Sequence, residues 1–158
     1  MNSGRTIVLD RTVPDFSTNS TAGVFRLSQQ RGHIVVLYFY PKDNTPGCTT
    51  ESQDFAAAND KFAAAGARII GVSRDSLASH EKFRAKYELP FELACDADES
   101  LCTLFAVIKQ KKMYGKSVRG IERSTFLIDA QGVLRREWRG LKVAGHVDEV
   151  LQAVLALA

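Results

Sequence analysis

The stretch "IVVLYFYPKDNTPGCTTE" (residues 34–51) joins a strand, a loop and the start of a helix, and it decides the fold. Its first seven residues form an apolar run of strand length that Pro41 stops. A loop with two prolines follows and leads to Cys48. Beyond it, apolar residues recur at helical spacing, at Phe55, Ala58, Phe62 and Ala65. Gly66 then closes the helix, so the stretch predicts a buried strand feeding a helix that begins at the cysteine.

The rest of the chain repeats this alternation. A short strand precedes a turn near Arg31-Gly32, and residues 109–120 are interpreted as a polar, glycine-bearing loop. The other predicted strands are 67–75, 91–96, 123–129 and 133–138, the last two joined by a turn at 130–132. The other predicted helices are 76–89, 98–108 and 147–158. This order predicts an α/β fold with three layers: a mixed central sheet, helices on both faces and an antiparallel hairpin at one edge.

Composition narrows the class of protein. With 158 residues and 45% hydrophobic content, we expect one domain spanning residues 1–158. The net charge of +3 does not call for nucleic acid or a membrane surface as a partner, and no apolar run approaches the length of a bilayer span. The start, "MNSGRTIVLDRTVPDF", lacks the pattern of a secretory signal. Three cysteines make no disulfide framework, so we expect a cytoplasmic protein with a reactive thiol.

Cys48 is the thiol placed for chemistry. In sheets of this kind, active sites gather where the carboxyl ends of strands meet the amino ends of helices. Unpaired backbone N–H groups and the helix dipole favour a thiolate at that location. A free cysteine is more often a small buried hydrophobe, and this reading holds for Cys95 and Cys102, which lie among apolar neighbours. For Cys48, the Pro-Gly turn and the helix start favour reactivity.

The segment "FYPKDNTPGCT" (39–49) resembles the P-x-x-x-T/S-x-x-C signature of peroxiredoxins, and in particular their bacterioferritin-comigratory (PrxQ) branch. The likeness covers almost the whole chain. It includes "VPDF" (13–16), "GVSRDS" (71–76), "MYGK" (113–116), "GIERSTFLID" (120–129) and "VAGHVDEVL" (143–151). The resemblance implies a thioredoxin-like fold and a thiol peroxidase that needs no cofactor. Its substrates would be hydrogen peroxide and small organic hydroperoxides, reduced through a cysteine sulfenic acid.

The same resemblance implies four site residues. Cys48 matches the peroxidatic cysteine, and Thr45 the hydroxyl that holds the peroxide next to the sulfur. Pro41 matches the proline that shields the thiolate from water. Arg123 matches the arginine that stabilises the thiolate and polarises the peroxide, a task that suits a guanidinium because it keeps its charge. Displacement at oxygen needs positioning and charge stabilisation more than acid–base groups, so the lack of a nearby histidine is no obstacle.

The chain departs from its relatives in the resolving cysteine. In this branch that cysteine usually lies five residues after the peroxidatic one or in the next helix, but here these positions hold Gln53 and Arg84. We therefore expect one-cysteine behaviour, with glutathione and glutaredoxin or thioredoxin as the external reductant. Resolution by Cys95 or Cys102 stays open. If strand 91–95 lies two places from strand 34–40, about 10 Å separates them, more than a disulfide spans.

Other interpretations are weaker but testable. The three histidines, His33, His80 and His146, share no ligand spacing with the cysteines, so we expect no metal site and interpret each as a surface or capping residue. A basic loop contains Lys109, Lys111, Lys112, Lys116 and Arg119. This loop is most simply a solvated face, although a non-enzymatic redox sensor could use it to dock a protein or nucleic acid. The short carboxyl terminus favours a monomer.

Overall fold

The computed structural model describes residues 7–157, without the side chains of Lys111 and Met113. Two parts of the chain lie outside the described residues. They are residues 1–6, which belong to the start interpreted as lacking a secretory signal, and Ala158, the last residue of the predicted closing helix. The opening strand–loop–helix prediction is confirmed: β3 spans Ile34–Phe39 and α1 spans Pro46–Ala64.

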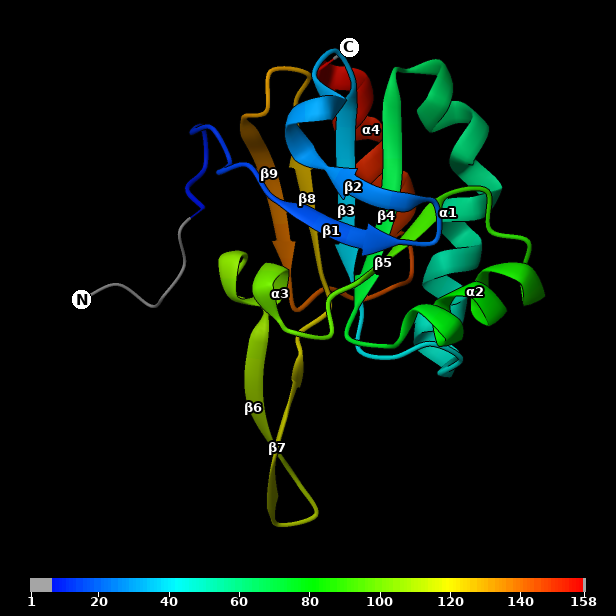
Figure 1. The fold of residues 1–158 in the computed structure, drawn as a ribbon, viewed down its shortest axis with the longest axis vertical. Helices are drawn as coiled ribbons and strands as arrows, with labels where there is room; N and C mark the ends of the chain where they lie inside the picture. The colour runs from blue at the N-terminus through cyan, green and yellow to red at the C-terminus, as the bar shows by residue number, and fades with distance from the viewer. Residues whose placement is uncertain (1–6, 158) are drawn as a thin grey trace.

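Seven strands form the main sheet in the order β2-β1-β5-β4-β3-β8-β9 (Figure 1). Their bounds are β1 Ser17–Ser20, β2 Gly23–Arg26, β3 Ile34–Phe39, β4 Ala67–Ser73, β5 Glu92–Cys95, β8 Ser124–Ile128 and β9 Leu134–Arg139. β3, β4 and β5 pair in parallel. β8 pairs antiparallel with β3 and with β9, which forms the expected antiparallel edge.

The sheet separates two hydrophobic cores. In β3 the side chains alternate: Val36 and Tyr38 belong to one core, whereas Val35 and Leu37 belong to the other. The first core packs against α1, α2 (Leu77–Lys86) and α4 (His146–Leu157). The second packs against α3 (Ser100–Leu104), a 3₁₀ turn (Leu27–Gln30) and the N-terminal segment. Helices cover both faces, so the three-layer prediction is confirmed (Figure 1).

The interpretation of residues 109–120 as a loop was wrong. These residues form a hairpin of β6 (Ile108–Met113) and β7 (Lys116–Ile121), a separate two-stranded sheet. Its turn residues, Tyr114 and Gly115, both have positive φ (52° and 78°), the backbone of a two-residue hairpin turn. Tyr-Gly is not among the strong signals for that turn, and the lysines hide any apolar alternation. β1 was likewise missed, because its sequence "STNS" has no apolar run.

Trp138 links the sheet to the C-terminal helix. Trp138, in β9, is partly buried against the first core, and its indole N–H donates to Glu149 of α4 at 2.7 Å. The His146 and Trp138 rings pack edge to face, at 5.7 Å between centroids.

Within residues 7–157, no helix combines the length and hydrophobicity that crossing a bilayer requires.

Candidate active site

The first turn of α1 places Cys48 at the carboxyl end of β3. Asn44 adopts a positive φ of 65° and Thr45 is extended, so the chain reverses and Pro46 becomes the first helical residue, where its missing N–H costs nothing. The Thr45 carbonyl accepts from the Thr49 N–H at 2.9 Å. Among the described residues, no side chain caps this helix start. The N–H groups of the first turn therefore stay available to an anion beside Cys48.

Arg123 lies against the cysteine, as the sequence predicted. It directly precedes β8, the strand that pairs with β3, and its Nη2 lies 3.4 Å from the Cys48 Sγ. Cys48 is only 1% exposed, so this contact has little water around it. Burial lowers the pKa of Arg123, but the charges of Glu51 and Cys48 outweigh burial and hold that pKa above its ordinary value. The sulfur therefore lies beside a permanent positive charge.

Gly47 allows the guanidinium to approach the helix closely. A Cβ built on Gly47 would lie 3.1 Å from Arg123 Nη2, tighter than ordinary van der Waals contact. A glycine in the first turn, which costs some helix propensity, thus leaves room for the arginine beside Cys48.

Glu51 completes this arrangement, and the sequence analysis missed it. It is fully buried one turn after Cys48, and its Oε1 accepts from Arg123 Nη1 at 2.7 Å. In the part of the chain that the structure describes, its Oε2 has no hydrogen-bond partner. Burial raises the pKa of Glu51 to about 7, although Arg123 acts to lower it. The spacing of three residues, which places Glu51 on the same helical face as Cys48, is the signal that could have found it.

Thr45 and Pro41 flank the thiol in the loop. The Thr45 hydroxyl donates to the Lys42 carbonyl at 2.8 Å, which fixes the hydroxyl at the amino end of α1. Thr45 is half-buried, and Pro41 is exposed where the loop leaves β3. The peroxide-holding role of Thr45 and the shielding role of Pro41 stay predictions.

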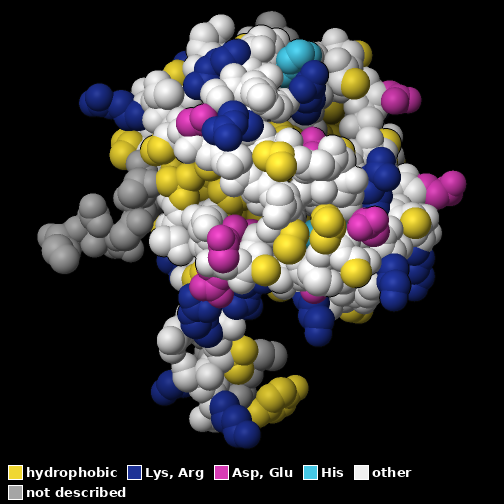
Figure 2. All heavy atoms as spheres, in the orientation of Figure 1, with side chains coloured by type: hydrophobic (Ala, Val, Ile, Leu, Met, Phe, Trp, Pro, Cys, Tyr) yellow, Lys and Arg dark blue, Asp and Glu magenta, His cyan; other side chains and the backbone are white. Residues whose placement is uncertain are grey.

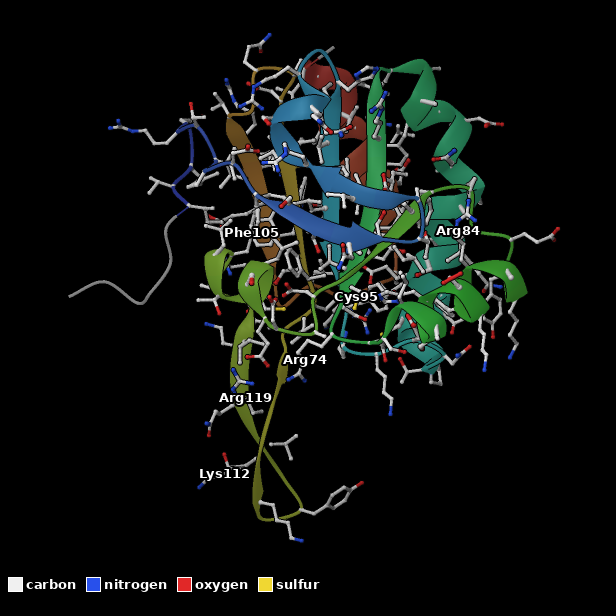
Figure 3. The ribbon with its side chains drawn as sticks, in the orientation of Figure 1. Arg74, Arg84, Cys95, Phe105, Lys112 and Arg119 are labelled. Atoms are coloured by element: carbon white, nitrogen blue, oxygen red, sulfur yellow. The ribbon has the colours of Figure 1, made fainter. Side chains whose placement is uncertain are left out.

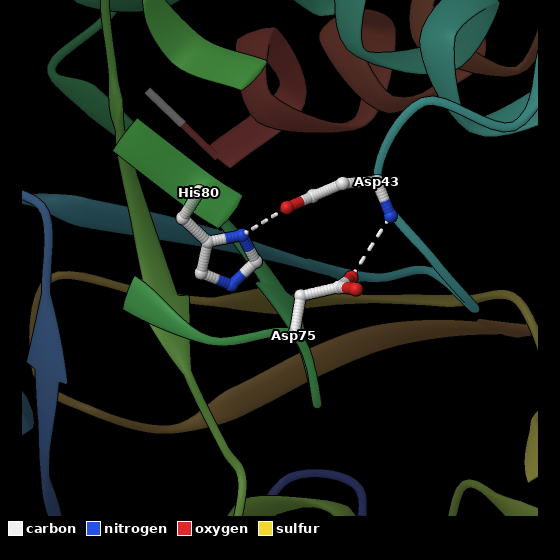
Figure 4. A group of neighbouring side chains, drawn as sticks. All are labelled: Asp43, Asp75 and His80. Carbon is white, nitrogen blue, oxygen red and sulfur yellow. Dashed lines mark hydrogen bonds and ion pairs between the residues drawn. The ribbon is translucent and has the colours of Figure 1, made fainter. Parts of the chain in front are cut away.

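A buried polar network anchors the loop to α2. The Asp43 carboxylate accepts from the Tyr40 hydroxyl at 2.7 Å and the Ser79 hydroxyl at 2.8 Å. It also lies 2.8 Å from His80 Nδ1 (Figure 4). The Asp43 N–H donates to Asp75 at 2.8 Å. Burial raises the pKa of Asp43, but its bonds with His80, Tyr40 and Ser79 outweigh burial and lower that pKa. The network fixes the segment between β3 and Cys48.

Two of the three histidine interpretations were wrong. His80 is fully buried, and its second ring nitrogen lies 2.9 Å from the Ala94 carbonyl of β5. His146 is also buried, 2.8 Å from the Thr125 hydroxyl, and burial lowers its pKa to about 4. His33 is exposed, as expected. Asp43, Asp75 and His80 offer ligand atoms within 4.8 Å of one another, but hydrogen bonds already use these atoms, so the group forms a structural network.

The family follows from comparison with known proteins. A model of the AhpC/TSA family matches residues 9–137. The chain belongs to this family. A curated relative, peroxiredoxin Bcp of Xanthomonas campestris, is 57% identical over 132 residues, which cover 84% of this chain and 82% of the relative. Peroxiredoxin Bcp of Bacillus subtilis is 49% identical over 150 residues, or 94% and 96% of the two chains. The protein is thus a peroxiredoxin of the bacterioferritin-comigratory branch and a thiol peroxidase.

Solved structures agree with the fold of this peroxiredoxin. Peroxiredoxin Q of Xanthomonas campestris superposes with a TM-score of 0.87 at 50% identity and covers 98% of both chains. The bacterioferritin comigratory protein of the same organism, solved in trapped intermediate and ligand complexes that concern its alkyl peroxide reduction, also has a TM-score of 0.87 at 50% identity. It covers 96% of this chain and 98% of its own.

The other two cysteines of the peroxiredoxin lie away from Cys48. Cys102 is buried in the second core, on the far side of the sheet from Cys48 in the first. Burial, and then the Asp96 carboxylate, raise the pKa of Cys102. Cys95 ends β5, and β4 separates β5 from β3, so about 10 Å divides the two strands. Cys95 instead lines a surface hollow with Thr18, Asp96 and Asp98.

Helix α2 is held in place at both ends. Arg84 Nε donates to the Phe91 carbonyl at 3.0 Å, which ties the last turn of α2 to the segment before β5 (Figure 3). At the other end, the Ser76 hydroxyl caps the helix by accepting from the Ser79 N–H at 3.1 Å. Phe83 is fully buried between these ends. These contacts fix α2 against the sheet.

Proposed function

We propose that this peroxiredoxin reduces hydrogen peroxide and small organic hydroperoxides through a sulfenic acid on Cys48, which an external thiol then resolves. The observation that carries the proposal is the contact of Cys48 Sγ with Arg123 Nη2 at 3.4 Å, at the start of a helix. The relative from Xanthomonas campestris described for its alkyl peroxide reduction supports the substrate class.

In the first step the Cys48 thiolate attacks one oxygen of the hydroperoxide. An S–O bond forms, the O–O bond breaks, and the leaving alkoxide or hydroxide takes up a proton to become an alcohol or water. Arg123 and the N–H groups of the first helical turn stabilise the charge that moves from sulfur to oxygen. Thr45 holds the peroxide next to the sulfur, and Pro41 shields the thiolate from water.

In the second step a thiol from outside the chain condenses with the sulfenic acid. The proposal of one-cysteine behaviour is supported by Gln53 and Arg84 at the usual resolving positions, and by the sheet between Cys48 and Cys102. Glutathione with glutaredoxin, or thioredoxin, is the proposed reductant. We further propose that the chain acts as one cytoplasmic domain and as a monomer. The alternatives are resolution by Cys95 or Cys102, or a redox sensor that oxidises once.

The test combines substitution with peptide mapping. Cys48→Ser should abolish peroxidase turnover, whereas Cys102→Ser should leave most of it. After one equivalent of peroxide, non-reducing mapping with dimedone present should find the adduct on Cys48, with Cys95 and Cys102 free. A quantitative Cys48–Cys95 or Cys48–Cys102 crosslink would contradict the one-cysteine mechanism. Retained turnover in Cys48→Ser would refute the proposed function itself, and a single oxidation without turnover would indicate a sensor.

A further inference from the structure

The β6–β7 hairpin stands apart from the body of the protein. Within residues 7–157, its two strands pair only with each other, from Ile108 opposite Ile121 to Met113 opposite Lys116. Six residues of strand extend for about 20 Å, and Figure 1 shows the hairpin projecting from the sheet into solvent. An isolated two-stranded hairpin is only marginally stable in water, so a projecting one suggests a functional role.

The hairpin is strongly basic and has an aromatic tip. Residues 108–121 hold five basic residues and no acidic one. Among the described side chains, Lys109, Lys112 and Lys116 are exposed, and Figure 2 shows lysines and arginines along the hairpin. Tyr114 at the turn is 99% exposed and Val118 is 43% exposed. Positive charge around an exposed aromatic is the composition of a surface that binds an acidic partner.

The base of the hairpin lies beside the candidate active site. β7 ends at Ile121, two residues before Arg123, which contacts Cys48. The Glu99 carboxylate accepts from Arg119 at 2.6 Å and from Arg74 at 3.0 Å, so it pins β7 to the segment that follows β4 (Figure 3). These pairs lower the pKa of Glu99 to about 2. The parallel strands β3 and β4 finish at the same end of the sheet. The hairpin therefore projects from the end of the sheet at which α1, with Cys48, begins.

We propose that the β6–β7 hairpin docks an acidic thiol protein that delivers electrons to oxidised Cys48. This inference rests on the proposed function and names the partner of the same site. The Cys48 sulfenic acid needs a thiol from outside, and the hairpin, whose base lies near the site, carries positive charge along its length. The partner's thiol attacks the Cys48 sulfur, an S–S bond forms, and water leaves with the sulfenic oxygen. A second thiol of the partner then displaces Cys48, so the partner ends as a disulfide.

A charge-reversal pair tests the docking. Lys112→Glu with Lys116→Glu removes positive charge from the hairpin. Arg11→Glu with Lys61→Glu makes the same change at exposed sites elsewhere and serves as the control. The probe is a thioredoxin with an acidic isoelectric point. Its second-order rate constant for reducing peroxide-oxidised protein is measured at about 0.01 M and about 1 M salt, where the screening length falls from about 30 Å to about 3 Å.

The hairpin pair should lose about tenfold in that rate constant at low salt, and most of the difference should vanish at high salt. The corresponding Lys→Gln pair should fall between the wild type and the Glu pair, and the control pair should match the wild type. Reduction by dithiothreitol, which is uncharged, should be equal in all variants. Equal rates with thioredoxin at low salt would overturn the proposal, as would the same loss with dithiothreitol.

Two further measurements distinguish protein docking from nucleic-acid binding and from a defect in the oxidation step. If duplex DNA binds the wild type and not the hairpin pair, while thioredoxin kinetics are equal, the surface serves nucleic acid and the proposal is overturned. Oxidation of Cys48 by hydrogen peroxide in a single turnover needs no reductant and should be the same in all variants. Failure of the wild type to oxidise at Cys48 would refute the proposed function, whereas normal oxidation with unaffected reduction would refute only the docking.

Discussion

Glu51→Gln should change how the stability of this peroxiredoxin depends on pH. Burial raises the pKa of Glu51 from an ordinary value of 4.5 to about 7. Between these two values the folded protein keeps a proton that the unfolded chain releases. The stabilising contribution is therefore fully present below pH 4.5 and is lost as the pH rises through about 7. At about 1.36 kcal/mol per pH unit, the free energy of unfolding falls by about 3 kcal/mol over this window because of Glu51 alone.

Glutamine has the shape of glutamate and no proton to lose, so Glu51→Gln should lack this fall. The assay is urea unfolding of both proteins, under reducing conditions, at pH values from about 4.5 to about 8. Other titrating groups contribute equally to both curves. The stability of the variant relative to the wild type should therefore rise by about 3 kcal/mol across the window. Asp60→Asn, at an exposed position near the end of the same helix, is the control and should give a flat difference.

Parallel stability curves for wild type and Glu51→Gln would refute the reasoning. That result would mean that the Arg123 pair at 2.7 Å compensates fully for burial and keeps Glu51 charged throughout. A difference that moves in the opposite direction would show that the pair stabilises the charged form beyond compensation.

Three further predictions concern the residues around the thiol. Arg123→Ala should slow single-turnover oxidation of Cys48 by about a hundredfold or more, because one preorganised donor is worth about 2.7–4 kcal/mol; wild-type kinetics would show that Arg123 takes no part in this step. Thr45→Val should slow the same step by roughly tenfold while Thr45→Ser keeps most of the rate, and equal rates would remove the hydroxyl from the mechanism. His80→Ala should lower the free energy of unfolding by about 2 kcal/mol, because it removes a fully buried ring and takes one partner each from the Asp43 carboxylate and the Ala94 carbonyl; an unchanged urea midpoint would mean that water replaces the ring.

The fold could be predicted where a buried strand or helix leaves a regular pattern of apolar residues in the sequence. β3, β4 and β5 carry apolar runs because both of their faces are covered, and α1 carries its apolar residues at helical spacing. The β6–β7 hairpin buries few of its side chains. Its sequence therefore has no hydrophobic periodicity from which its strands could be predicted. β1 also lacks an apolar pattern, although its four polar residues pair with β2 on one side and β5 on the other.

Some residues of the site could likewise be identified from the sequence, and others could not. Cys48 could be proposed from local sequence, because a thiol at a helix start has a physical consequence wherever it occurs. Arg123 lies 75 residues away from it, and only the resemblance to known peroxiredoxins linked the two. Glu51 and the Asp43–His80 network went undetected because their significance depends on burial. A carboxyl group becomes unusual only when the fold removes its water.

The placement of Trp138 gives the protein a built-in optical reporter. It is the only tryptophan in the chain, and it bridges β9 and α4 through Glu149 while its ring meets His146. Loss of α4 from the sheet would move the indole from a half-buried setting into water, so its emission follows the packing of the C-terminal helix without any label. Because the first core that it touches also contains Cys48, the same emission offers a way to watch whether oxidation of Cys48 loosens the packing of α4.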